Sequence, residues 1–285
     1  MIDLVKRTRI APTPSGFIHL GNLASFVYTH ALARVSNSTL MLRIDDLDQE
    51  RFRASYVNDI LDTLQFAGIH CHQEEFTQRE RKSLYASALA QLRNENKVYA
   101  CKCSRTERTA NLSHCACLQD HRSLDEPGVQ WKLLPAAPPT IEMHDWTRGV
   151  LVYPFPEEMS ALQVRKKNGD PSYHLASVVD DIHFGVTLIV RGEDLLASTL
   201  GQLHLAAVMG WEHFRSIQFV HHPLLLDTNQ QKMSKSSGSA SIQYMRAHGM
   251  SKEHVFAELS RHVGGSPSIA TLEELEEELL RIWGS

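Results

Sequence analysis

The stretch Arg9–Asn22, with the sequence RIAPTPSGFIHLGN, leads from a strand into a helix and decides the fold of the chain. Arg9–Ala11 is typical of a strand end, and the prolines and glycine after it force a turn. We predict a helix from Asn22 to Val35, because its apolar residues recur at helical spacing, and a buried strand over Thr39–Ile44. Strand, helix and strand of these lengths form a βαβ unit, from which parallel sheets are built. The sequence therefore predicts an α/β fold with a parallel sheet.

A region of different composition interrupts this α/β pattern. Residues 96–165 hold four of the five cysteines, the proline-rich segment LLPAAPPT and short apolar segments. We interpret this region as an insertion and predict four parts: residues 1–95 and 166–245 as the halves of the α/β domain, 96–165 as an inserted subdomain, and 246–285 as a helical tail. The other predicted helices are 54–67, 79–94, 198–210, 251–263 and 271–283, and the other extended segments are 186–190 and 217–226.

Several predicted helix ends carry capping signals. Gly210 is expected to end its helix, because glycine adopts the left-handed conformation of a C-cap without strain. Ser198 or Thr199 is expected to cap the start of the same helix. Thr271 and Glu274 have the spacing of a capping box and predict the start of the last helix.

The composition is that of a folded and slightly acidic chain. Its 285 residues carry 29 Lys and Arg against 33 Asp and Glu, a net charge of −4. This balance excludes a uniformly basic nucleic-acid coat, although it permits a local basic groove. No apolar run has the length of a membrane-spanning helix, and the first residues, MIDLVKRTRI, lack the apolar core of a signal peptide. We therefore expect a cytoplasmic protein with no membrane partner.

Four cysteines form two close pairs, Cys101-Lys-Cys103 and Cys115-Ala-Cys117. Two thiol pairs on two turns can converge on one tetrahedral Zn²⁺ ion, and four protein ligands leave no open position for a substrate. We therefore predict a structural zinc site, which suits a reducing compartment better than a disulfide framework does. His114 is an alternative to one thiol as a ligand, and four unrelated cysteines are the remaining interpretation.

Two polar motifs in the first fifty residues point to ligand binding. His19 lies at the start of the predicted helix, where a helix N-terminus and small residues favour phosphate. Asp45, Asp46 and Asp48 follow the strand at its carboxyl end, where open α/β sheets bind ligands. These carboxylates suit a substrate ammonium group or Mg²⁺, and helix capping is the alternative for any one of them.

A third motif, KMSKS, lies far along the chain in the polar segment DTNQQKMSKSSGSAS. Its Lys232 and Lys235 can neutralise the charge of a triphosphate if the segment is a mobile loop, although a solvated polar loop is the alternative. In this order, the motifs resemble the HIGH and KMSKS signatures of class I aminoacyl-tRNA synthetases. Finer matches indicate the glutamyl branch: APTPSGFIHLGN, LRIDDLD, PSYHLASVVDD and VRGED are similar to its APSPTG-x-x-H-x-G, LRIEDTD, YPTYHLA-x-VVDD and IRGED. The resemblance covers residues 7–245 and implies a Rossmann-like catalytic domain.

The length of the chain indicates which group within the glutamyl branch it resembles. About forty residues follow the KMSKS-like motif, which is too few for the helical anticodon-binding domain of a complete glutamyl-tRNA synthetase. The glutamyl-queuosine tRNA(Asp) synthetases lack that domain and carry zinc in the insertion, so the sequence resembles this group. The resemblance implies a monomer that uses ATP with Mg²⁺ to convert L-glutamate to glutamyl-adenylate. The glutamate is then transferred to the queuosine base in the anticodon loop of tRNA(Asp).

The resemblance also implies roles for individual residues. The residues expected to bind glutamate are Arg9, Thr13, Asp45, Tyr173 and Arg191. The residues expected to bind ATP are His19, Gly21, Lys232 and Lys235, of which His19 and Lys235 are expected to be catalytic. The residues expected to bind the metal are Cys101, Cys103, Cys115 and Cys117. Arginine suits a carboxylate because its guanidinium donates two parallel hydrogen bonds.

Three positions depart from the family pattern. Thr13 replaces a serine, and its hydroxyl can make the same hydrogen bond. Asp45 replaces the glutamate that receives the substrate ammonium group, and its side chain is one methylene shorter. Asn22 replaces the last residue of the HIGH signature, and we expect it to cap the helix.

Two other functions stay open at this point. A truncated glutamyl-tRNA synthetase would charge a tRNA 3′ end and would need tRNA to activate glutamate. A catalytically silent paralogue would bind tRNA without forming an adenylate. Zinc-dependent hydrolysis is disfavoured, because four cysteine ligands leave no open coordination position.

Overall fold

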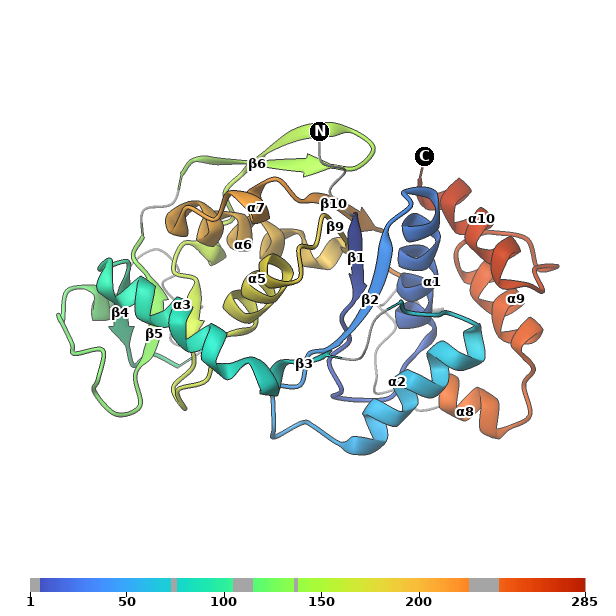
Figure 1. The fold of residues 1–285 in the computed structure, drawn as a ribbon, viewed down its shortest axis with the longest axis horizontal. Coiled ribbons are helices and arrows are strands. Elements are labelled where there is room, and N and C mark those ends of the chain that lie inside the picture. The colour runs from blue at the N-terminus through green and yellow to red at the C-terminus, as the bar shows by residue number, and fades with distance from the viewer. Residues whose placement is uncertain (1–5, 73–75, 105–114, 136–137, 226–240, 285) are drawn as a thin grey trace. The chain divides into compact units, whose positions relative to one another are not determined.

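The βαβ unit predicted around Arg9–Asn22 is present in the computed structural model of the chain (Figure 1). Strand β1 (Arg7–Ile10) leads into helix α1 (Leu20–Val35) and strand β2 (Thr39–Ile44). β1 pairs in parallel with β2 along its whole length, and β2 pairs in parallel with β3 (Phe76–Thr77). The prediction of an α/β fold with a parallel sheet is therefore confirmed.

The structure describes residues 6–72, 76–104, 115–135, 138–225 and 241–284. By packing, the chain divides into two units that alternate along the sequence. The first unit consists of Met1–Glu80, Thr187–Asp194 and Val220–Ser285, and the second of Arg81–Val186 and Leu195–Phe219. The four-part division that we derived from composition stays a prediction.

The first unit contains the parallel strands and the helices that pack on them. Thr187 precedes strand β9 (Leu188–Gly192) and donates its backbone N–H to the carbonyl of Arg7 (2.9 Å), which joins β9 to β1. Strand β10 (Gln218–His222), whose last three residues belong to this unit, lies next to β9. Its helices besides α1 are α2 (Ala54–Ala67), α8 (Ile242–Ala247), α9 (Lys252–His262) and α10 (Leu272–Trp283).

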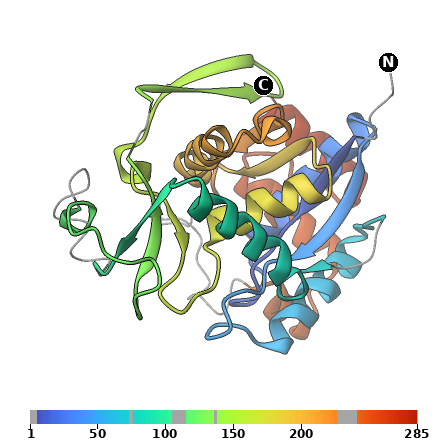
Figure 2. The ribbon, with the colours of Figure 1, turned by 60° about the vertical axis from the view of Figure 1, so that its left-hand side comes forward.

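The second unit contains an antiparallel sheet, a hairpin and its own helices. Strands β4 (Val98–Cys101), β5 (Gln130–Leu133) and β8 (Gln163–Arg165) form the sheet in that order. Strands β6 (Thr140–Asp145) and β7 (Gly149–Pro154) form the antiparallel hairpin. The helices are α3 (Lys82–Asn94), α5 (Tyr173–His183), α6 (Leu196–Met209) and α7 (Glu212–Arg215). Figures 1 and 2 show α3 beside α5, and the two helices are in contact.

Helix α1 is buried on most sides, because it lies against the strands and against α10 (Figure 1). Val27 of α1 and Leu275 of α10 are fully buried, and each such side chain stabilises the fold by roughly 2 kcal/mol. The buried Glu276 of α10 also forms ion pairs with His30 and Arg34 of α1. The last helix of the chain is therefore part of the core of the first unit.

Two of the predicted helix boundaries are confirmed by their caps. Gly210 ends α6 with a left-handed φ of 66°, and the predicted capping box of Thr271 and Glu274 begins α10. The start of α6 was predicted wrongly. Its N-cap is Leu195, and neither Ser198 nor Thr199 caps it, because a 3₁₀ turn runs directly into the helix. The structure describes no helix that is long and apolar enough to cross a membrane.

Candidate active site

His19 is the N-cap of α1 and is held by reciprocal hydrogen bonds with Asn22. The backbone N–H of Asn22 donates to His19 Nδ1 (3.3 Å), and the backbone N–H of His19 donates to Asn22 Oδ1 (3.4 Å). Because Nδ1 accepts, the proton of the neutral imidazole resides on Nε2. Asn22 takes part in capping as predicted, but as the third helical residue of a capping box, whereas the N-cap itself is His19. His19 thus stands as a donor at a helix N-terminus, where an anion is favoured.

Gly21 leaves room for the imidazole of His19. A β-carbon at position 21 would lie 3.1 Å from both Cε1 and Nδ1 of His19, closer than ordinary van der Waals contact. It would also lie 3.9 Å from Cβ of Leu225. Glycine at this position therefore lets the ring of His19 fold over the first turn of α1.

The described residues on either side of segment 226–240 lie beside the turn that contains His19. Leu225 precedes the segment and approaches Gly21, as described above. Ser241 follows the segment and forms an antiparallel bridge with His19. The two lysines of the KMSKS-like motif, Lys232 and Lys235, belong to this segment and lie outside the described residues. The chain on either side of them is nevertheless held beside the HIGH-like motif.

Ile18 is held from two sides and positions this turn. Its backbone N–H donates to Asp59 Oδ2 of α2 (2.7 Å), and its carbonyl accepts from the backbone N–H of Ile242 (2.7 Å). Burial raises the pKa of Asp59, although the Ile18 hydrogen bond and the charge of Arg246 oppose this shift. A buried carboxylate therefore orients the backbone next to His19.

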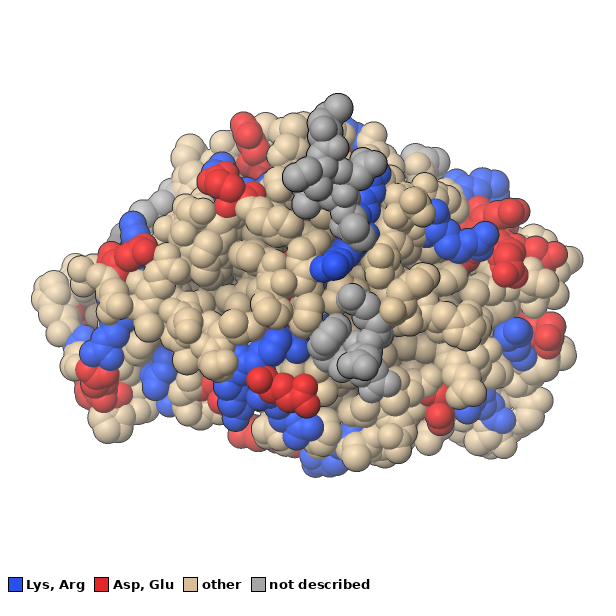
Figure 3. Space-filling view, in the orientation of Figure 1, with Lys and Arg blue, Asp and Glu red and all other residues tan. Residues whose placement is uncertain are grey.

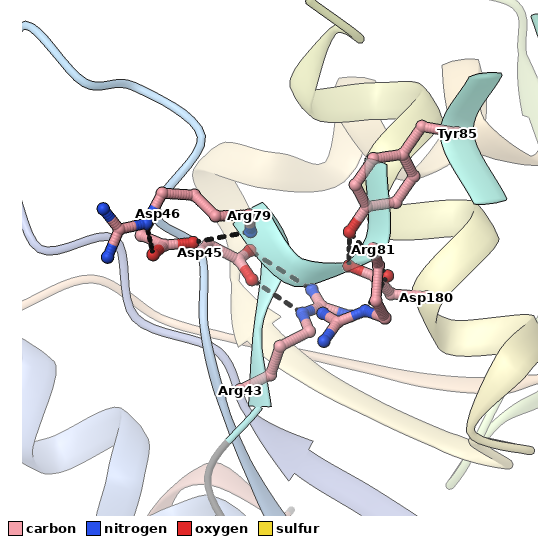
Figure 4. A network of polar contacts seen from close by, with 7 residues as sticks. All are labelled: Arg43, Asp45, Asp46, Arg79, Arg81, Tyr85 and Asp180. Carbon is pink, nitrogen blue, oxygen red and sulfur yellow. Dashed lines mark hydrogen bonds and ion pairs between the residues drawn. The ribbon is translucent and has the colours of Figure 1, made fainter. Parts of the chain in front are cut away.

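The carboxylates that follow β2 have separate arginine partners (Figure 4). Asp45 accepts hydrogen bonds from Arg43 Nε (2.6 Å) and Nη2 (3.2 Å), and both side chains are buried. Asp46 accepts from the backbone N–H (3.1 Å) and Nε (2.5 Å) of Arg79. Asp48 forms an exposed ion pair with its near neighbour Arg51. Arg43 therefore offsets the charge of the carboxylate that is predicted to receive the substrate ammonium group.

The two arginines predicted to bind carboxylates lie on adjoining strands of the first unit. Arg9 is on β1 and Arg191 on β9, and they are 6% and 5% exposed. Thr13 lies exposed in the turn after β1, which is tied to β2 because the Asp45 N–H donates to the Pro12 carbonyl (3.0 Å). Arg9, Thr13, His19, Gly21, Asp45 and Arg191 all belong to the first unit.

Tyr173, the remaining residue predicted to bind glutamate, belongs to the second unit. It is the first residue of α5, and its side chain is 39% exposed. Further along the same helix, the fully buried Asp180 accepts from Arg81 Nε (2.8 Å) and from the Tyr85 hydroxyl (2.8 Å; Figure 4). These bonds fasten α3 to α5, so the acidic end of the PSYHLASVVDD motif has a structural role.

The four cysteines predicted to bind metal come together in the second unit. Their sulfur atoms all lie within 4.8 Å of one another, with Sγ···Sγ distances of 3.6 Å (Cys101–Cys115), 3.5 Å (Cys103–Cys115) and 3.6 Å (Cys103–Cys117). A disulfide would be about 2.05 Å long. In a tetrahedron with Zn–S bonds of about 2.3 Å, the sulfurs are about 3.8 Å apart. The four thiols therefore fit one tetrahedral ion. His114 lies outside the described residues.

The ionisation of these thiols reflects their burial and their neighbours. Burial raises the pKa of Cys101 and of Cys103. At Cys117 burial acts in the same direction, but the Lys102 backbone N–H and the neighbouring thiols outweigh it and lower the pKa to about 7. Burial and the nearby thiols raise the pKa of Tyr99, so its hydroxyl stays protonated beside Cys115.

Charges of both signs are interspersed on the face shown in Figure 3. Several exposed basic side chains have an acidic partner, as in Arg93 with Asp125 and Lys102 with Glu126. This surface agrees with the net charge of −4 and does not resemble a nucleic-acid coat.

Comparison of the chain with known proteins identifies its family. The family described as tRNA synthetases class I (E and Q), catalytic domain, matches residues 5–279. The chain belongs to this family. A glutamate–tRNA ligase of Leptothrix cholodnii is 32% identical over 273 residues, which are 90% of this chain and 57% of the ligase. A glutamyl-Q tRNA(Asp) synthetase of Prochlorococcus marinus is 33% identical over 257 residues, 87% of this chain and 79% of that protein. The predicted resemblance to this enzyme family is thereby confirmed.

A solved structure supports the fold. The glutamate tRNA ligase of Elizabethkingia meningosepticum superposes with a TM-score of 0.76 at 20% identity, covering 96% of this chain and 64% of that one. The chain thus spans little more than half the length of the curated ligase and under two thirds of the solved one. Membership in the family brings with it the class I catalytic fold, which this superposition supports.

Sequence reasoning missed several residues that shape these sites. Asp59 and Gln130 were not predicted to take part, because their partners belong to other segments of the chain. Arg43 was not assigned a role either, although its partner Asp45 is a near neighbour in the sequence. The short spacing between Arg43, in β2, and Asp45, directly after β2, is the one local signal that was available.

Proposed function

We propose that the protein activates L-glutamate with ATP and Mg²⁺ and transfers it to the queuosine base in the anticodon loop of tRNA(Asp). The observation that carries this proposal is the bridge between His19 and Ser241, which holds the chain after the KMSKS-like motif against the HIGH-like turn. The similarity to a glutamyl-Q tRNA(Asp) synthetase, of which the chain covers 79%, supports the acceptor. The protein acts as a cytoplasmic monomer in this proposal.

The phosphate side of the reaction uses the turn at His19. With Nδ1 occupied by Asn22, the Nε2–H of His19 donates to a phosphate oxygen of ATP. Gly21 allows the nucleotide to approach the first turn of α1. Lys232 and Lys235 neutralise charge as the glutamate carboxylate attacks the α-phosphate and pyrophosphate leaves. Orientation and electrostatics, rather than proton transfer, then account for most of the acceleration.

The glutamate side uses the buried arginines of β1 and β9. Arg9 and Arg191 bind substrate carboxylates through paired hydrogen bonds, and burial strengthens these bonds because water competes less. Asp45, positioned by Arg43, receives the ammonium group of glutamate. Thr13 supplies a hydroxyl to this substrate, and the resemblance to the family assigns Tyr173 a hydroxyl contact with glutamate.

The cysteine cluster has a structural role in this proposal. Cys101, Cys103, Cys115 and Cys117 hold one Zn²⁺ ion, which cross-links the strand end at β4 to the turn at residues 115–117. Four thiolates leave no position for a substrate, so the cluster takes no part in adenylate formation.

The similarity to glutamate–tRNA ligases supports a second candidate function, the charging of a tRNA 3′ end. Pyrophosphate exchange with glutamate in the absence of RNA distinguishes the two, with aspartate and glutamine as controls. Exchange without RNA supports the queuosine-directed enzyme, whereas a strict requirement for tRNA supports the ligase. No exchange under either condition contradicts both and leaves a silent tRNA-binding paralogue.

The acceptor is tested with tRNA(Asp) that contains queuosine and lacks its 3′-terminal adenosine. Incorporation of labelled glutamate into this RNA, but not into unmodified tRNA(Asp), is the expected result. Loss of incorporation on removal of the 3′ adenosine would instead assign the 3′ end as the acceptor.

A further inference from the structure

The sheet that carries Cys101 has an unusual polar face. In the register of β4 and β5, Tyr99 lies opposite Lys132 and Cys101 opposite Gln130, and alternation puts all four on one face. Gln130 and Lys132 are 5% and 1% exposed, although glutamine and lysine are rarely buried so completely. Aliphatic residues would be expected at these positions if packing alone selected them.

Gln130 is an oriented hydrogen-bond donor to the cysteine cluster. Its Nε2 donates to Cys101 Sγ (3.6 Å) and to the Cys103 carbonyl (2.8 Å). Its Oε1 accepts from Nε2 of Gln163 on β8 (2.6 Å), which leaves the amide only one orientation. A donor held in this way points at the Cys101 sulfur from one fixed direction.

Lys132 places a buried positive charge beside the same cysteine. Lys132 lies opposite Tyr99 and diagonal to Cys101 on this face, and none of the described carboxylates forms an ion pair with it. A buried ammonium group without an opposite charge is costly. Four thiolates around a divalent ion carry a formal charge of −2, which is costly to bury for the same reason. The positive charge of Lys132 and the negative charge of a metal-loaded cluster would therefore compensate each other.

We propose that Lys132 is the counter-charge of the metal-loaded cysteine cluster, with Gln130 as the donor that orients Cys101. The inference rests on the proposed metal binding by the four cysteines. It adds that metal occupancy and the burial of this lysine depend on each other. Metal binding is then tighter because Lys132 is present, and metal-free protein is less stable because Lys132 is buried without a partner.

The test measures Zn²⁺ affinity of the full chain by competition with a chromophoric chelator. Lys132→Met keeps the length of the side chain and removes the charge, and we expect roughly 10–100-fold weaker binding. Lys132→Gln is a second neutral variant, and Lys132→Arg, which keeps the charge, should restore most of the affinity. The matched control is Lys102→Met: Lys102 lies between two ligands in sequence, but it is exposed and paired with Glu126, so its loss should change affinity by about 2-fold or less.

Thermal unfolding gives a second test. If Lys132 had only a structural role, its replacement would change the Tm in the same direction with and without metal. With metal chelated, Lys132→Met should unfold at a higher temperature than wild type; with metal bound, its advantage should disappear or reverse. Equal Zn²⁺ affinity of wild type and Lys132→Met, or lower stability of the variant in both states, would overturn the counter-charge role. Absence of stoichiometric Zn²⁺ in wild type would overturn the metal site itself.

Discussion

Asp59 of α2 accepts the backbone N–H of Ile18 at 2.7 Å, across a separation of 41 residues in the sequence. This bond joins the helix after β2 to the residue that precedes the N-cap His19. It makes the position of the HIGH-like turn depend on a buried carboxylate whose pKa is raised by burial. Asp59 therefore positions the turn at His19 through a backbone hydrogen bond, and we assign it no catalytic role.

We expect Asp59→Ala to destabilise the protein by about 1–3 kcal/mol, because the buried N–H of Ile18 loses its acceptor. Asp59→Asn keeps an acceptor and removes the cost of a buried charge, so its stability should be close to that of wild type. Denaturant unfolding measures stability, and pyrophosphate exchange at a temperature where both variants are folded measures activity. Equal loss in both variants would show that the charge, rather than the hydrogen bond, is required.

Gly21→Ala should reduce activity without reducing stability. The new methyl group would press on the His19 ring at 3.1 Å, while alanine is the better residue within a helix by roughly 0.5–1 kcal/mol. We expect a raised KM for ATP in the exchange reaction and an unchanged or higher Tm. An unchanged KM would mean that the ring of His19 does not contact the nucleotide.

Lys235→Ala should slow glutamate activation by about 10²–10³-fold, because charge that develops on the leaving pyrophosphate would lose its stabilising partner. The fold should be intact, as judged by far-UV circular dichroism and Tm. The matched control is Lys252→Ala, in the first turn of α9, which should retain full activity. Wild-type exchange kinetics in Lys235→Ala would remove the KMSKS-like motif from the proposed mechanism.

Stability should fall as the pH drops below the ordinary histidine pKa of 6.5. Burial lowers the pKa of His222 and of His204 in the folded chain, so below pH 6.5 the unfolded state binds more protons. Each histidine contributes stability that is present above pH 6.5 and is lost as pH falls, by at most about 1.4 kcal/mol per pH unit. Urea unfolding at pH 7.5 and 5.0 measures the effect, and His222→Asn should reduce the pH dependence.

Chelation of metal should destabilise the protein and leave its fold weakened around β4. A ligand at a thousand-fold excess over its Kd stabilises by about 4 kcal/mol, so the Tm should fall measurably when a strong chelator is added. Cys117→Ser should reproduce the loss, whereas Cys71→Ser, which is not a member of the cluster, should retain the response to chelator. An identical Tm with and without chelator would contradict metal binding by this cluster.

Local signals in the sequence predicted helix ends well where the capping interaction involves only residues within a few positions of each other. The capping box of Thr271 and Glu274 and the left-handed Gly210 depend on backbone geometry within a few residues, and both were predicted. Ser198 and Thr199 have the same chemistry as Thr271, yet neither caps α6, because the preceding turn at 193–195 already begins the helix. Residue type therefore predicts a cap only where the preceding backbone leaves the first N–H groups without partners.

The sequence by itself determined the βαβ unit, the family motifs and the set of four cysteines, because alternation, helical spacing and short-range ligand spacing depend on near neighbours. The tertiary structure alone decided that Asp59 accepts the backbone N–H of Ile18 and that Ser241 pairs with His19. It also placed Lys132 and Gln130 on the same face of the sheet as Cys101. These contacts join residues that are distant in sequence or whose strand face is chosen by pairing register, and burial then makes each polar group depend on the partner that packing supplies.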